Sequence, residues 1–156
     1  MGSSLVIAKD DPRAGDVQAL IRSHLQFANE QTPPEDVHAL DLNGLLNPTV
    51  TVFSARRRRE LVAIGALQKL DETRAELKSM HTAEGAREQG VGRAMLEALI
   101  AVARRQRYRQ VSLETGTMDA FTPARSLYLS AGFVPCGPFG DYRPSPNSMF
   151  MTLTLE

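Results

Sequence analysis

The chain has 156 residues, of which 42% are hydrophobic and 23% are charged. These values are typical of one folded domain, and they exclude a disordered chain, a collagen-like repeat and a coiled coil. Basic and acidic residues number 18 each, so no net charge attracts the protein to nucleic acid or to an anionic membrane. We therefore expect a single domain over residues 1–156, with no nucleic-acid or membrane partner.

The cysteine and histidine content argues against a disulfide and against a metal site. Cys136 is the single cysteine, and His24, His38 and His81 are far apart in the sequence. An intrachain disulfide is therefore excluded, and no zinc-site spacing is present, so we expect no metal. No apolar stretch has the length of a membrane span, and the first residues do not resemble a signal peptide. We expect a cytoplasmic protein.

The first half of the chain mixes helical and strand patterns. Pro33 and Pro34 exclude a helix interior at that point, and the apolar residues that follow indicate a short second helix. Short polar links between the later strands favour an antiparallel meander. In chain order, we predict a strand at 5–8, a helix starting at Asp16, a short helix over 37–42, and strands at 49–55, 61–70 and 76–82.

The second half begins with the clearest amphipathic helix. Val91, Met95 and Leu99 lie on one face of it, at helical spacing. We predict this helix over 91–107, then a strand at 111–114, a helix at 123–131 and strands at 133–135 and 148–155. A helix between two strands permits a parallel crossover, so the fold class is a mixed α/β (α+β) domain with helices on both faces of the sheet.

Residues 87–94 carry the pattern most informative about chemistry, Arg-Glu-Gln-Gly-Val-Gly-Arg-Ala, between a strand and the long helix. Glycines let backbone amides approach a ligand, and a helix N-terminus favours an anion, so the segment predicts a cradle for phosphate or pyrophosphate. Arg87 and Arg93 can add charge-assisted contacts. A P-loop is excluded because no Lys and Ser or Thr follow Gly92, and a dinucleotide fingerprint because Met95 replaces its third small residue. The alternative is a plain tight turn.

Two motifs together resemble one family. The pattern Arg87-x-x-Gly90-x-Gly92 resembles the acetyl-coenzyme A (acetyl-CoA) signature of the GCN5-related N-acetyltransferases (GNAT), Gln/Arg-x-x-Gly-x-Gly/Ala. Residues 124–133, Ala-Arg-Ser-Leu-Tyr-Leu-Ser-Ala-Gly-Phe, are similar to the family's Ala-x-x-Leu-Tyr-x-x-x-Gly-Phe helix. Further segments resemble a bacterial subgroup with poorly defined substrates; they are 37–42, 112–116 and 135–139.

The resemblance implies the acyl-CoA N-acyltransferase (GNAT) fold, a mixed, mostly antiparallel sheet of six or seven strands whose splayed centre holds acetyl-CoA. Backbone groups of Met80, His81 and Thr82 would bind the pantetheine arm, and amides from Gln89 to Ala94 would bind the pyrophosphate. One departure is Phe121, which stands where many members have Asn, so any contact of that Asn with the cofactor is absent. The implied cofactor-binding residues are Met80, His81, Thr82, Arg87, Glu88, Gln89, Gly90, Val91, Gly92, Arg93 and Ala94.

The resemblance also implies direct attack of a substrate amine on the thioester. Tyr128 is the candidate general acid that protonates the leaving thiolate, and a packing role on the apolar face of its helix is the alternative. Glu114 is the first candidate base, ahead of Glu76 and His81. For each of these three side chains, a solvated or structurally paired role is the alternative.

Other readings of the sequence concern binding rather than transfer. A non-catalytic acyl-CoA sensor would keep the cradle without turnover. The run at 56–59, four arginines, lies between two strands without interleaved aromatic residues, so a solvated hairpin is favoured over nucleic-acid binding. Cys136 lacks a histidine nearby in sequence, which favours a packed thiol over a nucleophile.

The acceptor is expected to be a small-molecule or peptide amine, and a homodimer stays open. In the family, the N-terminal region helps to line the acceptor site, and residues 1–50 are rich in acids, which favours a cationic amine. These seven acids are Asp10, Asp11, Asp16, Glu30, Glu35, Asp36 and Asp41.

Overall fold

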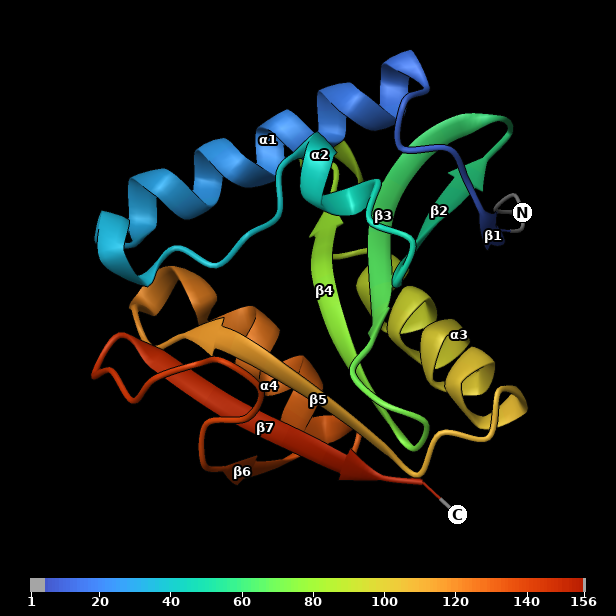
Figure 1. Cartoon of the computed structure of the whole chain (residues 1–156). Coiled ribbons are helices and arrows are strands. Elements are labelled where there is room, and N and C mark those ends of the chain that lie inside the picture. Colours follow the sequence, from blue (N-terminus) through green and yellow to red (C-terminus); the bar gives the residue numbers. More distant parts are fainter. Residues whose placement is uncertain (1–4, 156) are drawn as a thin grey trace.

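The computed structural model describes residues 5–155, in which seven strands form one sheet (Figure 1). The strands are β1 (Leu5–Lys9), β2 (Val50–Arg57), β3 (Glu60–Lys69), β4 (Arg74–Thr82), β5 (Gln110–Gly116), β6 (Val134–Cys136) and β7 (Ser148–Thr154). The helices are α1 (Gly15–Gln31), α2 (Leu42–Leu45), α3 (Val91–Arg105) and α4 (Thr122–Ser130), with short 3₁₀ helices η1 (Pro34–Asp36), η2 (Glu84–Ala86) and η3 (Asp119–Phe121).

The sheet order is β1-β2-β3-β4-β5-β7-β6, and β4 and β5 are parallel while the other neighbouring pairs are antiparallel. The helix α3 makes the crossover between the two parallel strands. This arrangement confirms the predicted mixed, mostly antiparallel sheet. The parallel pairing covers three residue pairs and ends at Glu76 opposite Ser112. Beyond that point β4 and β5 diverge (Figure 1).

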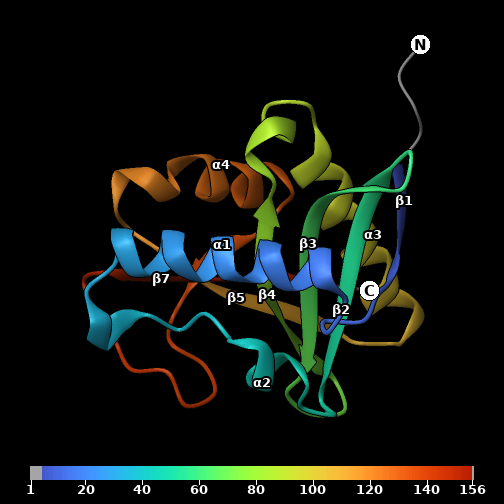
Figure 2. The same cartoon turned by 90° about the horizontal axis from the view of Figure 1, so that it is seen from above.

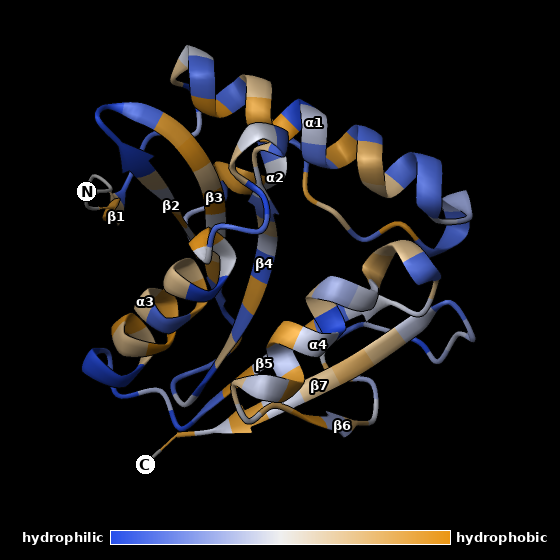
Figure 3. Ribbon diagram, turned by 180° about the vertical axis from the view of Figure 1, so that it is seen from behind, coloured by the Kyte–Doolittle hydropathy of each residue, from blue (hydrophilic) through white to orange (hydrophobic). Residues whose placement is uncertain are grey.

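Helices cover both faces of the sheet, as expected. The helix α1 crosses one face and α3 lies against the other (Figure 2). One hydrophobic cluster joins α3 and α4 to the sheet, and a second joins α1 and α2 to β2 and β3. Figure 3 shows hydrophobic and hydrophilic residues mixed along α1 and α3. Their buried residues recur at helical spacing, so burial of one side against the sheet explains why these two segments are helical. In α3 the buried side chains recur at helical spacing, namely Val91, Met95, Leu96, Leu99, Ile100 and Ala103.

The expected short helix over 37–42 is wrong in position. The helix α2 occupies Leu42–Leu45 instead, and Val37 is extended. The Asp41 carboxylate accepts a hydrogen bond from the Gly44 backbone amide at 2.9 Å and so caps α2 at that residue. The capping aspartate therefore starts the helix later than the apolar spacing predicts.

The arginine run at 56–59 lies in a tight hairpin, whose strands extend further than predicted. Arg56 and Arg57 belong to β2, and the turn consists of Arg58 and Arg59, with φ values of 52° and 68°. Positive φ at both positions is the geometry of two-residue hairpin turns. No helix within residues 5–155 is long and apolar enough to cross a membrane.

Candidate functional site

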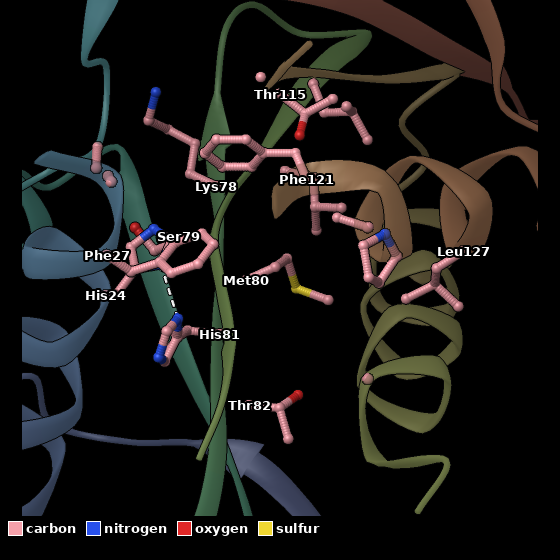
Figure 4. Close-up of a pocket in the computed structure, with 18 of the residues that line it drawn as sticks. His24, Phe27, Lys78, Ser79, Met80, His81, Thr82, Thr115, Phe121 and Leu127 are labelled. Carbon is pink, nitrogen blue, oxygen red and sulfur yellow. Dashed lines mark hydrogen bonds between the residues drawn. The ribbon is translucent and has the colours of Figure 1, made fainter. Parts of the chain in front are cut away.

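A cavity of about 610 Å³ opens where β4 and β5 diverge. Its walls come from α1, the 36–39 segment, β4, the start of α3, β5 and α4, and Figure 4 shows part of this lining. One end of the cavity contacts the glycine-containing segment before α3, and the other end contacts the β6–β7 loop through Tyr142. The parting of two parallel strands is thus the structural origin of the candidate site.

A bulge in β4 shapes this opening. The register between β3 and β4 shifts between Ile64 and Ala66, and Ser79 has a φ of 56°. A Cβ atom at Gly65 would lie 2.7 Å from Met80 Sδ and 2.9 Å from Leu99 Cδ1, so any larger residue there would have to displace these two side chains. Past the bulge, His81 and Thr82 pair with β3 on one side, while the other edge of β4 faces the cavity. Met80, His81 and Thr82, expected at the pantetheine arm, all line the cavity (Figure 4).

The segment before α3 forms what we call the cradle loop (residues 87–90). Glu88 and Gly90 have φ values of 64° and 79°, and no side chain caps the helix N-terminus. Amides at an uncapped helix N-terminus lack intrahelical partners and can bind an anion. A Cβ atom at Gly92 would lie 3.6 Å from Thr82 Oγ1, so the helix start and the open edge of β4 are neighbours.

The cavity wall includes most of the expected pyrophosphate contacts, namely Arg87, Glu88, Gly90, Val91, Gly92 and Arg93. Two expected residues behave differently. The Ala94 amide donates to the Gly90 carbonyl at 3.1 Å, so it closes the first turn of α3 and is not free. Gln89 is not among the described residues that line the cavity, and its side chain accepts a hydrogen bond from Arg57.

Tyr128, the candidate general acid, lines the cavity and also belongs to the hydrophobic core. Its side chain is 7% exposed and packs against Phe133. Burial, and then the nearby Glu114 carboxylate, raise the pKa of the Tyr128 phenol above its usual range. The phenol is therefore a neutral hydrogen-bond donor at the cavity wall. The packing and catalytic interpretations both fit this position.

Glu114, the first candidate base, lies on β5 in the cavity wall. Burial raises the pKa of its carboxyl to about 7, while Lys78 lowers this pKa and Glu76 raises it. Near neutral pH the carboxyl thus exists in both protonation states. A group with this pKa can accept a proton and release it again.

The other two base candidates are less available. Glu76 is 4% exposed and forms an ion pair with Lys78 at 3.0 Å, and the Tyr142 hydroxyl donates to the same carboxylate oxygen. His81 Nδ1 lies 3.1 Å from His24 Nδ1, and burial lowers the pKa of both imidazoles to about 4. The two rings are therefore neutral at neutral pH, and one Nδ1–H donates a hydrogen bond to the other Nδ1.

Sequence reasoning did not identify Lys78 and Tyr142, which both line the cavity. The Lys78 ammonium donates to the Tyr142 hydroxyl at 2.8 Å, and Tyr142 packs edge-on against His38. Its spacing could have identified Lys78, because side chains two residues apart on a strand lie on the same face. Lys78 is two residues after Glu76 and therefore shares its face. Tyr142 gave no such signal because it is on a distant loop.

Phe121, which replaces the family's Asn, lines the cavity at the start of α4. Its ring contacts Phe27 of α1 edge-to-face, with centroids 5.3 Å apart, and lies over Gly116 (Figure 4). A Cβ atom at Gly116 would overlap this ring. An aromatic contact therefore joins α1 to the residue that precedes α4.

The acids of the N-terminal region are mostly engaged elsewhere, which corrects the basis for expecting a cationic acceptor. Asp10 and Asp16 bind Arg56 at 3.0 and 2.6 Å, and Asp11 binds Arg13. Of the seven acids, Asp36 is the one in the described cavity wall. It accepts hydrogen bonds from Ser145 and Asn147 of the β6–β7 loop. The negative charge at the cavity thus comes from acids on different elements.

Cys136 lies in β6, outside the described cavity wall, and burial raises the pKa of its thiol. Both observations fit a packed thiol better than a nucleophile. Within residues 5–155, no group of three or more His, Cys, Asp or Glu side chains is placed to hold a metal ion.

Comparisons with known proteins point to one family. The model described as "Acetyltransferase (GNAT) family" matches residues 17–133. The chain is 45% identical to the uncharacterized N-acetyltransferase YedL of Escherichia coli (strain K12) over 149 residues, covering 96% of this chain and 94% of that protein. It is 43% identical to the uncharacterized N-acetyltransferase YsnE of Bacillus subtilis (strain 168) over 146 residues, covering 94% and 97%.

The fold also matches solved structures. A GNAT family acetyltransferase from Elizabethkingia anophelis, crystallised with acetyl-CoA bound, superposes with a TM-score of 0.72 at 19% identity. The match covers 97% of this chain and 98% of that one. The mixed sheet with helices on both faces is therefore the fold of the GNAT acetyltransferases.

Proposed function

The chain belongs to the acetyltransferase (GNAT) family, and from that membership we propose that one domain over residues 1–156 transfers an acetyl group from acetyl-CoA to a primary amine. The observation that carries the proposal is the meeting, in one cavity, of an open strand edge and an uncapped helix N-terminus. An extended thioester arm fits the strand edge, and an anionic pyrophosphate fits the helix start.

We assign the pantetheine arm to the edge of β4 at Met80, His81 and Thr82, because peptide groups there face the cavity and lack partners on β5. The pyrophosphate is assigned to the backbone amides of the cradle loop and of the first turn of α3. Arg87 is the first residue of this loop, is exposed, and is suited to add a charge-assisted contact with a phosphate. The assignment matches the cofactor site that the family signature implies.

The proposed reaction is a direct transfer. The amine nitrogen attacks the thioester carbonyl carbon, a C–N bond forms, and the C–S bond breaks. Glu114 accepts the proton that the amine loses, which its pKa of about 7 permits near neutral pH. Tyr128 stays a protonated phenol because burial raises its pKa, so it can donate its proton to the departing sulfur.

The charges in the cavity favour a cationic amine as the acceptor. Asp36, Glu76 and Glu114 line the cavity with a single lysine, Lys78, while burial lowers the pKa of the His38 imidazole and keeps it neutral. These three carboxyl groups outnumber the lysine ammonium, so a protonated amine is attracted to the part of the cavity that they line. The expectation of a cationic acceptor thus rests on acids from three elements of the cavity wall, and no longer on the acid content of residues 1–50.

One assay tests the proposal. Purified protein is incubated with acetyl-CoA and a panel of amines, namely diamines, neutral monoamines, amino acids and a peptide with a lysine, and thiol release is recorded. Calorimetric titration with coenzyme A is run in parallel. We expect binding and acetylation of a cationic amine. Binding without transfer to any amine would favour the acyl-CoA sensor, and absence of binding would reject the cofactor site.

A further inference from the structure

The arginine hairpin contacts the cradle loop. Arg57, near the end of β2, donates from Nη1 to Gln89 Oε1 at 2.7 Å. The two residues are 32 positions apart in the chain. The hydrogen bond therefore joins the β2–β3 hairpin to the segment that precedes α3.

The Gln89 side chain also makes a hydrogen bond to η2. Its Nε2 donates to the Gly85 carbonyl at 3.3 Å, so the amide group bridges the hairpin and η2. Glu88 and Gly90 line the cavity, whereas Gln89 is outside its described wall. The Gln89 side chain thus points away from the cavity side of the cradle loop, and the residues on either side of it line the cavity.

The cradle loop has a conformation that needs support. Glu88 has a φ of 64° and Gly90 a φ of 79°, and the first is a backbone conformation that residues other than glycine rarely adopt. Such conformations persist when the surrounding structure holds them. The Arg57–Gln89–Gly85 chain of hydrogen bonds holds the residue between these two positions.

The Arg57 side chain is half-buried. Its Nε atom is buried and has no hydrogen-bond partner among the described residues, and its Nη1 atom makes the hydrogen bond to Gln89 near the surface. Arg57 is also outside the described cavity wall. Its location suits a brace for the loop, and it does not suit a direct contact with a ligand in the cavity.

We propose that Arg57 is a positioning residue for the cofactor, which acts through Gln89 to hold the backbone amides of the cradle loop towards the pyrophosphate. This inference rests on the proposed cofactor site. If the cradle loop adopts its binding conformation for only a fraction of the time, the apparent affinity for the cofactor is reduced to that fraction. Loss of one charge-assisted hydrogen bond changes such an equilibrium by about three- to tenfold.

The test is a double-mutant cycle on coenzyme A affinity. Calorimetric titration with coenzyme A is performed on the wild type, on Arg57→Met, on Gln89→Leu and on the double variant. Methionine keeps the apolar stem of the arginine, and leucine keeps the volume of glutamine. Arg59→Met is the matched control, because it removes one positive charge from the exposed turn of the same hairpin.

We expect the Kd of coenzyme A to rise about three- to tenfold in each single variant and no further in the double variant than in Gln89→Leu, since both substitutions remove the Arg57–Gln89 hydrogen bond. The KM of acetyl-CoA should rise by the same factor, with kcat and the amine KM unchanged. Arg59→Met should keep the wild-type Kd. A merely structural role would lower the melting temperature without this split between KM and kcat.

Three results would overturn the inference. A folded Arg57→Met variant with wild-type affinity for coenzyme A shows that the Arg57–Gln89 hydrogen bond does not position the cradle loop. Additive effects in the double variant show that Arg57 contacts the cofactor directly, and equal weakening by Arg59→Met shows long-range attraction alone. If Arg57→Met does not fold, Gln89→Leu decides, because Gln89 is exposed on a loop. Failure of the wild type to bind coenzyme A rejects the proposed function itself.

Discussion

The two ends of the cavity are built in different ways. The proposed cofactor end consists of backbone from two consecutive stretches, the last residues of β4 and the segment from the cradle loop into α3. The proposed acceptor end consists of side chains from distant segments, and Tyr142 reaches Glu76 across 66 positions of the chain. Backbone amides can hold a constant ligand, whereas side chains can change without altering the fold. We therefore expect the proposed cofactor end to be common to a family and the proposed acceptor end to be particular to a chain.

Substitution of the proposed base should have the largest effect on the acceptor end. Glu114→Gln removes the proton acceptor, and we expect kcat to fall about 100-fold. In the wild type, kcat should rise with pH as the carboxyl loses its proton near pH 7, and the variant should lack this rise. The measurement is steady-state kinetics from pH 5.5 to 9.

A measurement of thermal stability is the control for this kinetic experiment. A carboxyl whose pKa is raised by folding destabilises the folded state once it is ionised, so Glu114→Gln should melt no lower than the wild type at pH 8. Glu76→Gln is the comparison variant. If it loses the pH-dependent step while Glu114→Gln keeps it, the base is Glu76.

Tyr128→Phe tests the residue that lies between core and cavity. If the phenol protonates the leaving thiolate, kcat should fall at least about tenfold with little change in the acetyl-CoA KM, since the interaction arises in the transition state. Phenylalanine keeps the ring, so the melting temperature should stay near that of the wild type. A fully active variant would leave Tyr128 with its packing role alone.

Gly92→Val tests the cofactor end. A Cβ atom at Gly92 fits without overlap, 3.5 Å from Leu127 Cδ2, but the valine methyl groups would enter the space between Thr82 and Leu127. We expect the Kd of coenzyme A to rise at least about tenfold, or about 1.4 kcal/mol, by calorimetric titration. Gly92→Ala is the control, with a much smaller change. Unchanged affinity in a folded valine variant would reject this site for the pyrophosphate.

The smallest expected effect is on electrostatic attraction of the acceptor. Raising the salt concentration from about 0.01 to 0.5 M should raise the KM of a cationic amine about two- to threefold, and more than the KM of acetyl-CoA. In Asp36→Asn this dependence should weaken, because a carboxylate of the cavity wall is lost. A best substrate with net negative charge would contradict the charge argument.

Local patterns in the sequence indicated several residues that the structure places in the cavity wall. Gly90 and Gly92 before an amphipathic helix indicated an anion site, and both line the cavity. The same reasoning did not reveal the hydrogen bond of the Gln89 side chain to Arg57, because a loop pattern does not tell where a side chain points. It also misplaced the helix at 37–42, where the capping by Asp41 depends on one hydrogen bond.

The sequence by itself determined the order of strands and helices, the amphipathic face of α3 and the glycine positions, because these depend on local periodicity and backbone freedom. Only the tertiary structure decided which charges share the cavity. It paired Asp10 and Asp16 with Arg56, it brought Lys78 to Tyr142, and it buried Glu114 so that its pKa rises to about 7. Burial and Coulomb interactions act through space, and the fold alone sets those distances.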